Sequence, residues 1–239
     1  MPATFYRWFS ERQKEVTAYG RARRARTERS RLAMVARHLQ PPGLLLEIGP
    51  GQGTLAQLAL AQGWRYRGID ASAVLAETLR ARNLDIVEAW VPPIPAEDAA
   101  CDVLYADQVL EHMAGIDAAR ALVAEAYRVV RPGGLFYVVV PDYLKEKTFF
   151  WDVDYTHNFI TTERRVRQLL YDGGFEILDV VRQIGAATGL PRDLLAAGAL
   201  LLNVPGVDTV SRWTGSEGLL FKARKNLFQT LAFVARRPA

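Results

Sequence analysis

The sequence Leu44-Leu45-Leu46-Glu47-Ile48-Gly49-Pro50-Gly51-Gln52-Gly53 places three glycines directly after an apolar segment. Residues 44–48 predict a strand, since they are mostly apolar and end in turn residues, and residues 52–62 suit a helix. The glycines therefore fall on a strand-to-helix turn. Without Cβ atoms they let the backbone turn tightly and approach a ligand, and the helix start offers unpaired N–H groups. The pattern predicts a site for a nucleotide-like ligand.

Asp70 supports this prediction, because it ends the next apolar segment about 20 residues further on, where a carboxylate can accept both hydroxyls of a ribose. Two other interpretations of the glycines are open. They can serve packing alone, or they can belong to a dinucleotide fingerprint. That fingerprint requires a glycine at position 54, where Thr54 stands, which argues against an NAD-linked dehydrogenase.

The pattern Glu-x-Gly-x-Gly-x-Gly over residues 47–53 resembles motif I of the class I S-adenosylmethionine-dependent methyltransferases. Other segments similar to this family are Leu110-Glu111-His112 after the fourth expected strand, Arg131-Pro132-Gly133-Gly134 before the fifth, and Gly174-Phe175 before the sixth. The resemblance implies a small-molecule methyltransferase (EC 2.1.1.-, "methyltransferase 11/12"-like) whose cofactor is S-adenosyl-L-methionine.

The expected fold class is α/β, because strands alternating with helices require parallel pairing with crossovers. The resemblance implies a Rossmann-like, doubly wound seven-stranded sheet in the order 3-2-1-4-5-7-6, with strand 7 antiparallel and helical additions at both ends of the chain. After residues 44–48, strands are expected at 66–69, 85–89, 101–106, 135–140, 176–181 and 227–235. The domain assignment is an N-terminal helical lid (1–40), a methyltransferase core (41–184 and 224–237) and a cap insertion (185–223).

The resemblance also implies which residues contact the cofactor: Glu47, Gly49, Gly51, Gly53, Asp70, Ala71, Trp90, Asp107 and Gln108. Asp107 and Gln108 belong here because ligands of open α/β sheets bind beyond the carboxyl ends of the strands. Asp107 can equally cap the short helix that follows. The family's adenine-binding acid is missing or displaced to Glu88, so Trp90 or backbone groups are expected to replace it.

Residues 142–159 follow the fifth strand and are rich in polar and aromatic side chains, so they are expected to overhang the crevice. Within them, Asp154-Tyr155-Thr156-His157 resembles the acceptor side of small-molecule methyltransferases. His157 is the candidate base for an alcohol acceptor, because an imidazole titrates near neutral pH. Asp154 would orient His157 or bind a sugar hydroxyl.

Four further residues are assigned to the substrate: Tyr19, Tyr143, Tyr155 and His112. Each of these roles has a purely structural alternative. His157 can be a hydrogen-bonded loop histidine, and Glu111 with His112 can brace a loop. No compact acidic ligand set follows the fourth strand, so no metal site is expected.

The two additions have unusual compositions. Residues 1–40 are expected to be helical, to lie outside the core and to break at Tyr19-Gly20, and seven arginines fall within 21–37. That arginine run can be a solvated face, or it can meet an anionic substrate, a membrane surface or nucleic acid. The apolar run 194–202 in the cap can bind an apolar substrate, lie on a membrane surface or fill a small hydrophobic core of its own.

Composition bounds the remaining possibilities. The chain has 239 residues, half of them apolar, so it can bury one sizeable core. A single cysteine, Cys101, and the lack of a leader-like start favour the cytoplasm, and no apolar run reaches the roughly 20 residues of a membrane span. The net charge of +4 is modest.

The function expected from these features is O-methylation of a small molecule, a glycan or a lipid-linked intermediate. One alternative is a non-catalytic module that binds S-adenosylmethionine or docks a partner. Another is a nucleic-acid methyltransferase, which is disfavoured because Ala106-Asp107-Gln108-Val109 stands where a base-flipping Asn-Pro-Pro-Tyr motif would follow the fourth strand.

Overall fold

A computed structural model describes residues 17–239 and contains a single seven-stranded sheet in the order β3-β2-β1-β4-β5-β7-β6. The strands are β1 Leu44–Ile48, β2 Arg65–Asp70, β3 Ile86–Glu88, β4 Cys101–Asp107, β5 Val130–Pro141, β6 Glu176–Ile184 and β7 Gln229–Arg236. β7 runs antiparallel to both neighbours, and the other neighbouring strands pair in parallel. The predicted fold class and strand order are confirmed.

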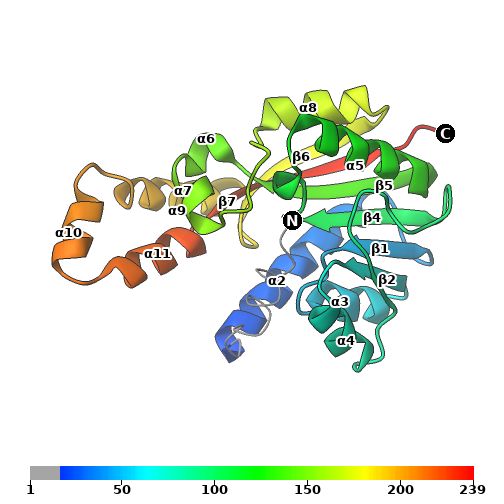
Figure 1. Cartoon of the computed structure of the whole chain (residues 1–239), viewed down its shortest axis with the longest axis horizontal. Helices are drawn as coiled ribbons and strands as arrows, with labels where there is room; N and C mark the ends of the chain where they lie inside the picture. Colours follow the sequence, from blue (N-terminus) through cyan, green and yellow to red (C-terminus); the bar gives the residue numbers. More distant parts are fainter. Residues whose placement is uncertain (1–16) are drawn as a thin grey trace.

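Helices cover both faces of the sheet and give the domain two apolar cores (Figure 1). One face carries α5 Ile116–Val129 and α8 Glu163–Asp172, and the other carries α2 Ala18–Val35, α3 Thr54–Ala61 and α4 Ala73–Arg80. The central strands are apolar on both sides because both faces are covered. Ser72 and Thr162 begin α4 and α8 by accepting hydrogen bonds from the backbone N–H groups of Leu75 and Arg165, so the N-cap predicted at Ser72 is confirmed.

The N-terminal segment differs from its prediction in two ways. α2 begins at Ala18 with Thr17 as its N-cap, so Tyr19 and Gly20, which were expected to break the helical pattern, lie in its first turn. Its last turns also belong to the core, since Leu32 and Val35 are buried against the sheet rather than outside it. An apolar pair one turn apart at the end of an arginine-rich helix provides this docking face.

The Arg131-Pro132-Gly133-Gly134 segment is not the turn that was expected before the fifth strand. β5 begins at Val130, directly after α5, and these four residues lie inside it. The pairing of β5 with β4 shifts register between Cys101 and Val103, and Gly133 N donates to Arg237 O. A bulge-like irregularity thus absorbs the proline and glycines.

Short helices after β4 and β5, and a larger helical lobe after β6, add to the sheet and its covering helices. After β5 come the short helices α6 Tyr143–Glu146 and α7 Phe149–Val153, and after β4 a single 3₁₀ turn, η1 Leu110–His112. Residues 189–226 form three helices, α9 Gly189–Leu201, α10 Val207–Trp213 and α11 Glu217–Asn226, which extend away from the sheet as a separate lobe, called the cap below (Figure 1). α11 runs past the predicted cap boundary at residue 223.

Candidate active site

The glycine turn after β1 has the backbone that only glycine adopts easily. Gly49, Gly51 and Gly53 have φ values of 72°, 52° and 71°. A Cβ on Gly53 would lie 2.9 Å from Leu79 Cδ2, so this glycine is needed for packing, whereas one on Gly51 would meet, among residues 17–239, only Arg24 Nη1 at 3.4 Å. α3 begins at this turn without a side-chain cap. The turn therefore has a backbone that can approach a ligand closely, and it leads into a helix whose first N–H groups have no partner within the helix.

Asp70 lies beside this turn, because Ile48 pairs with Ile69 in the parallel β1–β2 ladder and both strands end at the same edge. Its carboxylate is buried and accepts a hydrogen bond from Ser72 N at 2.8 Å, and burial raises its pKa. Ala71 follows it, half-buried, and Trp90 follows β3 with 46% of its surface exposed. The sheet thus brings the residues predicted for the ribose and adenine to one edge.

Asp107 and Gln108 end β4 with polar atoms that no described residue satisfies. Oδ2 of Asp107 lies 2.5 Å from Arg31 Nη1, but its Oδ1 is buried without a hydrogen-bond partner within residues 17–239. Gln108 has a φ of 56°, and its Nε2 is likewise buried and unpartnered in that range. Buried polar groups are normally hydrogen-bonded, so these two atoms fit a polar ligand at this edge. The glycine turn, Asp70, Asp107 and Gln108 are called the donor edge below.

Arg31 ties α2 to the donor edge. Besides Asp107 it contacts Glu28 Oε1 and Gln183 Oε1, both at 3.4 Å, and Tyr105 Oη donates to Glu28 Oε2 at 2.7 Å. Burial raises the pKa of Glu28 against the opposing effect of Arg31. The solvated-face interpretation of the arginine run is therefore wrong for Arg31. Sequence could not single it out, because it is one of seven similar arginines.

Glu47 has a partner that the glycine motif did not suggest. It is buried, and Tyr66 Oη donates to its Oε2 at 2.5 Å. Burial raises its pKa to about 8, although the hydrogen bond from Tyr66 opposes this. The side chain is thus largely protonated at neutral pH, and its contact with the cofactor stays a prediction.

His157 is buried, and its ring is held by the backbone rather than by an acid. Its Nδ1 lies 2.6 Å from the carbonyl oxygen of Phe150, so Nδ1 carries a proton and donates, and Nε2 keeps its lone pair. Burial lowers the pKa of this imidazole. The prediction that the Asp154 carboxylate orients the His157 ring is wrong, because that carboxylate bonds Thr156 and only the backbone oxygen of Asp154 accepts from His157 N, at 3.3 Å.

Asp154 instead orients His112 through Thr156. Its Oδ1 accepts from Thr156 N at 2.9 Å and from Thr156 Oγ1 at 2.7 Å. Since the hydroxyl proton points to Asp154, Thr156 Oγ1 accepts from His112 Nδ1, 2.8 Å away. Burial, together with the nearby His157, lowers the pKa of His112 to about 4. Both imidazoles are therefore neutral near pH 7 and keep Nε2 lone pairs.

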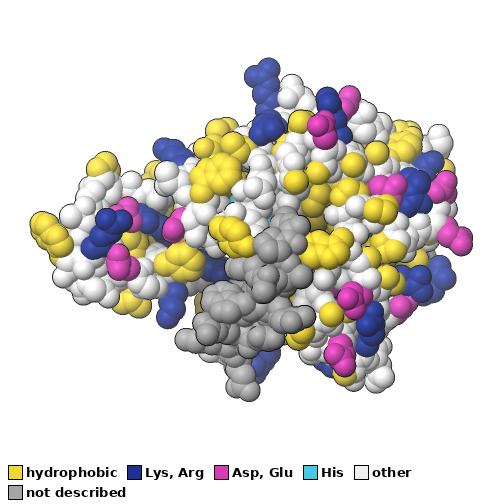
Figure 2. Space-filling view, in the orientation of Figure 1, with side chains coloured by type: hydrophobic (Ala, Val, Ile, Leu, Met, Phe, Trp, Pro, Cys, Tyr) yellow, Lys and Arg dark blue, Asp and Glu magenta, His cyan; other side chains and the backbone are white. Residues whose placement is uncertain are grey.

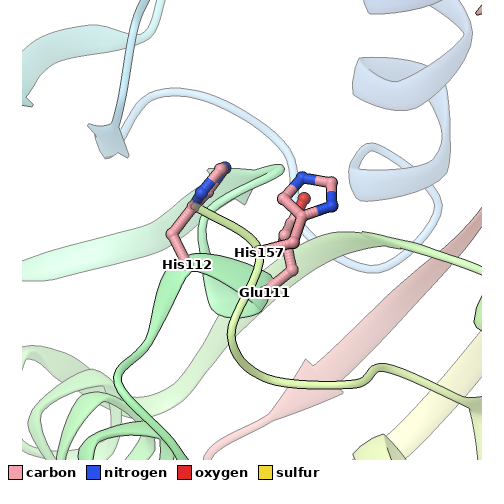
Figure 3. Close-up of side chains that lie close together, drawn as sticks. All are labelled: Glu111, His112 and His157. Carbon is pink, nitrogen blue, oxygen red and sulfur yellow. The ribbon is translucent and has the colours of Figure 1, made fainter. Parts of the chain in front are cut away.

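Glu111 completes this group, with its side chain close to both imidazoles (Figure 3). It is fully buried, and neither carboxyl oxygen has a hydrogen-bond partner among the described residues, so its pKa is raised well above its usual value by burial. Its backbone oxygen accepts from Asn158 N and Phe159 N, at 2.8 and 2.9 Å, which docks the histidine loop on η1. Glu111, His112 and His157 are called the acceptor cluster below.

One ligand atom of each residue in the acceptor cluster lies within 4.8 Å of the other two. Two imidazoles and a carboxylate form a donor set that first-row transition metals use. Sequence reasoning missed this grouping because His157 is distant in the chain from the other two. The expectation of no metal stays a prediction.

The three tyrosines assigned to the substrate occupy different environments. The Tyr143 ring packs at 5.4 Å from Phe150, next to the loop that carries His157, while Tyr155 and Tyr19 are 60% and 78% exposed. Their roles stay predictions. Residues 1–16 of the predicted N-terminal lid lie outside the described residues.

The model of a family described as "Methyltransferase domain" matches residues 18–180, which hold the donor edge and the acceptor cluster. The chain belongs to this family. It carries a class I S-adenosylmethionine-dependent methyltransferase domain, a family whose cofactor is S-adenosyl-L-methionine.

Relatives of this methyltransferase agree with the assignment. The "Probable S-adenosylmethionine-dependent methyltransferase" of Mycolicibacterium smegmatis is 35% identical over 57% of this chain and 53% of its own length. The malonyl-[acyl-carrier protein] O-methyltransferase of Serratia marcescens is 28% identical over 72% of this chain and 62% of its own. The chain spans about half the length of the first of these curated relatives.

A solved structure shows the same fold. The methyltransferase in complex with the Trm112 activator of Haloferax volcanii superposes with a TM-score of 0.64 at 18% identity, over 91% of this chain and 92% of the other. At this identity the likeness supports the methyltransferase fold alone.

Proposed function

We propose that this methyltransferase transfers a methyl group to a hydroxyl oxygen of a small molecule, a glycan or a lipid-linked intermediate. The observation that carries the proposal is the tautomer of His157, whose Nδ1 is committed to Phe150 O while Nε2 is left as a proton acceptor. The Serratia marcescens relative, an O-methyltransferase by name, supports an oxygen acceptor.

The donor edge supplies the groups that would hold S-adenosylmethionine. The glycine turn would receive its amino-acid end, and Asp70 its ribose, with Trp90 beside the adenine. The unsatisfied atoms of Asp107 and Gln108 would pair with polar groups of the cofactor. The bound cofactor supplies an electrophilic methyl group whose leaving thioether is neutral. The main task of the chain is then alignment, which can account for about 7–11 kcal/mol of the barrier.

The acceptor cluster would handle the proton. His157 Nε2 would take the proton of the acceptor hydroxyl as the hydroxyl oxygen accepts the methyl group that the cofactor would supply. A base of this kind contributes about 10²–10⁴-fold to the rate. Because burial lowers the pKa of His157, the base form persists below the usual pH range of an imidazole. Burial and the nearby His157 keep His112 neutral, so this neighbour does not protonate first, while Thr156 and Asp154 fix the orientation of its ring.

The test measures methyl transfer from labelled S-adenosylmethionine to panels of hydroxylated small molecules, glycans and polyprenyl-linked sugars. His157→Asn keeps a donor for Phe150 O but lacks the Nε2 lone pair, so it should bind the cofactor normally and lose about 10²–10⁴-fold in rate. His112→Asn, which can still donate to Thr156, is the matched control and should lose less. Full turnover by His157→Asn would refute the base.

Two controls separate the proposal from its competitors. Chelation by EDTA should leave the rate unchanged. If EDTA abolishes the activity and added metal restores it, then a metal ion held by the acceptor cluster, and not His157, activates the hydroxyl. If the acceptor were a nucleic acid, its binding would weaken steeply as the salt concentration rises. Methylation of an RNA or DNA pool that falls off in this way with salt would refute a small-molecule acceptor.

A further inference from the structure

The cap carries apolar side chains that its own helices do not cover. On α9 only Ala199 is buried, while Leu190, Leu194 and Leu201 are 71%, 67% and 70% exposed. The expectation that this apolar run fills a small core is therefore wrong. These three leucines lie within about 40° of one another around the helix axis and form a stripe roughly 16 Å long.

The rest of the cap continues this apolar surface. Trp213 at the end of α10 is 84% exposed, and Leu219 on α11 is 69% exposed. Between α10 and α11 lies an open groove of about 620 Å³, lined mainly by Leu202, Val207, Val210, Leu219 and Leu220. Figure 2 shows hydrophobic side chains out to the far end of the cap, with charged ones between them. Exposed apolar surface on this scale marks an interaction site.

The charge of the cap favours an anionic partner. Its three acids, Asp193, Asp208 and Glu217, each lie within ion-pair distance of an arginine. Lys222 and Lys225 on α11 are exposed and form no ion pair with a residue in the described part of the chain. The free charge of the cap is therefore positive.

α2 adds to this positive surface. Arg23 donates to both the side chain and the backbone oxygen of Asn226, the latter at 2.8 Å, which fixes the arginine-rich start of α2 beside the end of α11. Arg26 and Arg29 on the same helix are exposed. A second copy of the chain would bring like charges together across a symmetric interface, whereas an anionic surface would neutralise them.

We propose that the cap docks this methyltransferase on an anionic phospholipid bilayer. The α9 stripe and Trp213 enter the boundary between headgroups and acyl chains, and Lys222, Lys225 and the arginines of α2 lie against the headgroups. The docking proposed here is peripheral. No helix within residues 17–239 is long and apolar enough to cross a membrane. The docking does not depend on which acceptor is methylated.

Co-sedimentation of the full chain with vesicles tests the docking. Binding is expected to vesicles of phosphatidylcholine with a quarter phosphatidylglycerol, to weaken at high salt, and to be much weaker to phosphatidylcholine alone. The double variant Leu194→Asp/Leu201→Asp should lower partitioning at least about tenfold. Lys222→Glu/Lys225→Glu should lower it on anionic vesicles only. Leu60→Asp, an exposed leucine of α3 outside the cap, is the matched control and should bind normally.

Two results would overturn the proposal. One is that the wild type does not bind anionic vesicles, or that the leucine double variant binds them as well as the wild type does. The other is a concentration-dependent dimer, seen by light scattering, that the double variant abolishes and vesicles do not compete away, which would assign the surface to a second copy. Methyl transfer to a water-soluble acceptor in the double variant reports the proposed function separately.

Discussion

The donor edge and the acceptor cluster differ in how their members come together. The donor edge consists of residues at the carboxyl ends of neighbouring parallel strands, so the sheet alone aligns Gly49–Gly53, Asp70 and Asp107. The acceptor cluster joins η1 to a loop 45 residues away through Glu111 O and the chain Asp154–Thr156–His112. The strand order alone fixes which residues meet at the donor edge. The residues of the acceptor cluster meet only if individual hydrogen bonds hold the loop against η1.

The largest expected effect concerns Arg31, which ties α2 to the donor edge. Arg31→Met removes the cation between Asp107 and Glu28 and leaves two acids facing each other in a largely buried site. The free energy of unfolding should fall by about 3–5 kcal/mol, measured by urea denaturation. Arg26→Met, an exposed arginine on the same helix, should change it by less than about 0.5 kcal/mol. Equal stability of both variants would show that β-strand order alone holds the donor edge.

A smaller effect distinguishes the glycines within the donor edge. Gly51→Ala forces a side chain into a backbone with a φ of 52°, at a cost of about 1–2 kcal/mol, so cofactor affinity measured by calorimetry should fall about tenfold.

Gly53→Ala should add a loss of stability, because its Cβ would lie 2.9 Å from Leu79. Unchanged affinity in Gly51→Ala would mean that the turn does not approach the cofactor. Neither substitution should alter the titration of His157 or His112 followed by NMR, since the acceptor cluster is held by separate contacts.

The smallest effect is the change in the free energy of unfolding per pH unit. It has opposite signs near the donor edge and in the acceptor cluster. Glu47, next to the glycine turn, has its pKa raised from 4.5 to about 8, so the unfolded chain ionises first and stability is lost as pH rises through this range. His112 has its pKa lowered from 6.5 to about 4, so the unfolded chain takes up a proton first and stability is lost as pH falls from 6.5 towards 4.

Urea unfolding across pH 4.5–8 without cofactor separates these contributions. The free energy of unfolding of Glu47→Gln, relative to that of the wild type, should increase as the pH rises. That of His112→Asn should increase as the pH falls. Each change is at most about 1.4 kcal/mol per pH unit. Parallel curves for a variant and the wild type would mean that the side chain titrates as it does in the unfolded chain.

Sequence patterns predicted the elements whose causes are local. β1 was placed at its observed bounds, α4 and its Ser72 cap were anticipated, and the sheet order was implied by the resemblance. Arg131–Gly134 was misplaced because tertiary pairing with β4 and Arg237 extended a strand through residues that favour turns. The partner of the Asp154 carboxylate was also misassigned, since it is Thr156, and spacing within a loop does not say which neighbour a carboxylate reaches.

By itself, the sequence determined that a glycine turn follows the first strand and that acids end the second and fourth. Strand periodicity and glycine conformation depend on nearest neighbours, which is why these features could be predicted. Only the tertiary structure decided that Arg31 is buried against Asp107, that Glu111, His112 and His157 meet, and that the leucines of α9 face outward. Each of these depends on which surfaces of distant segments pack together, and packing at long range leaves no periodic signal in the chain.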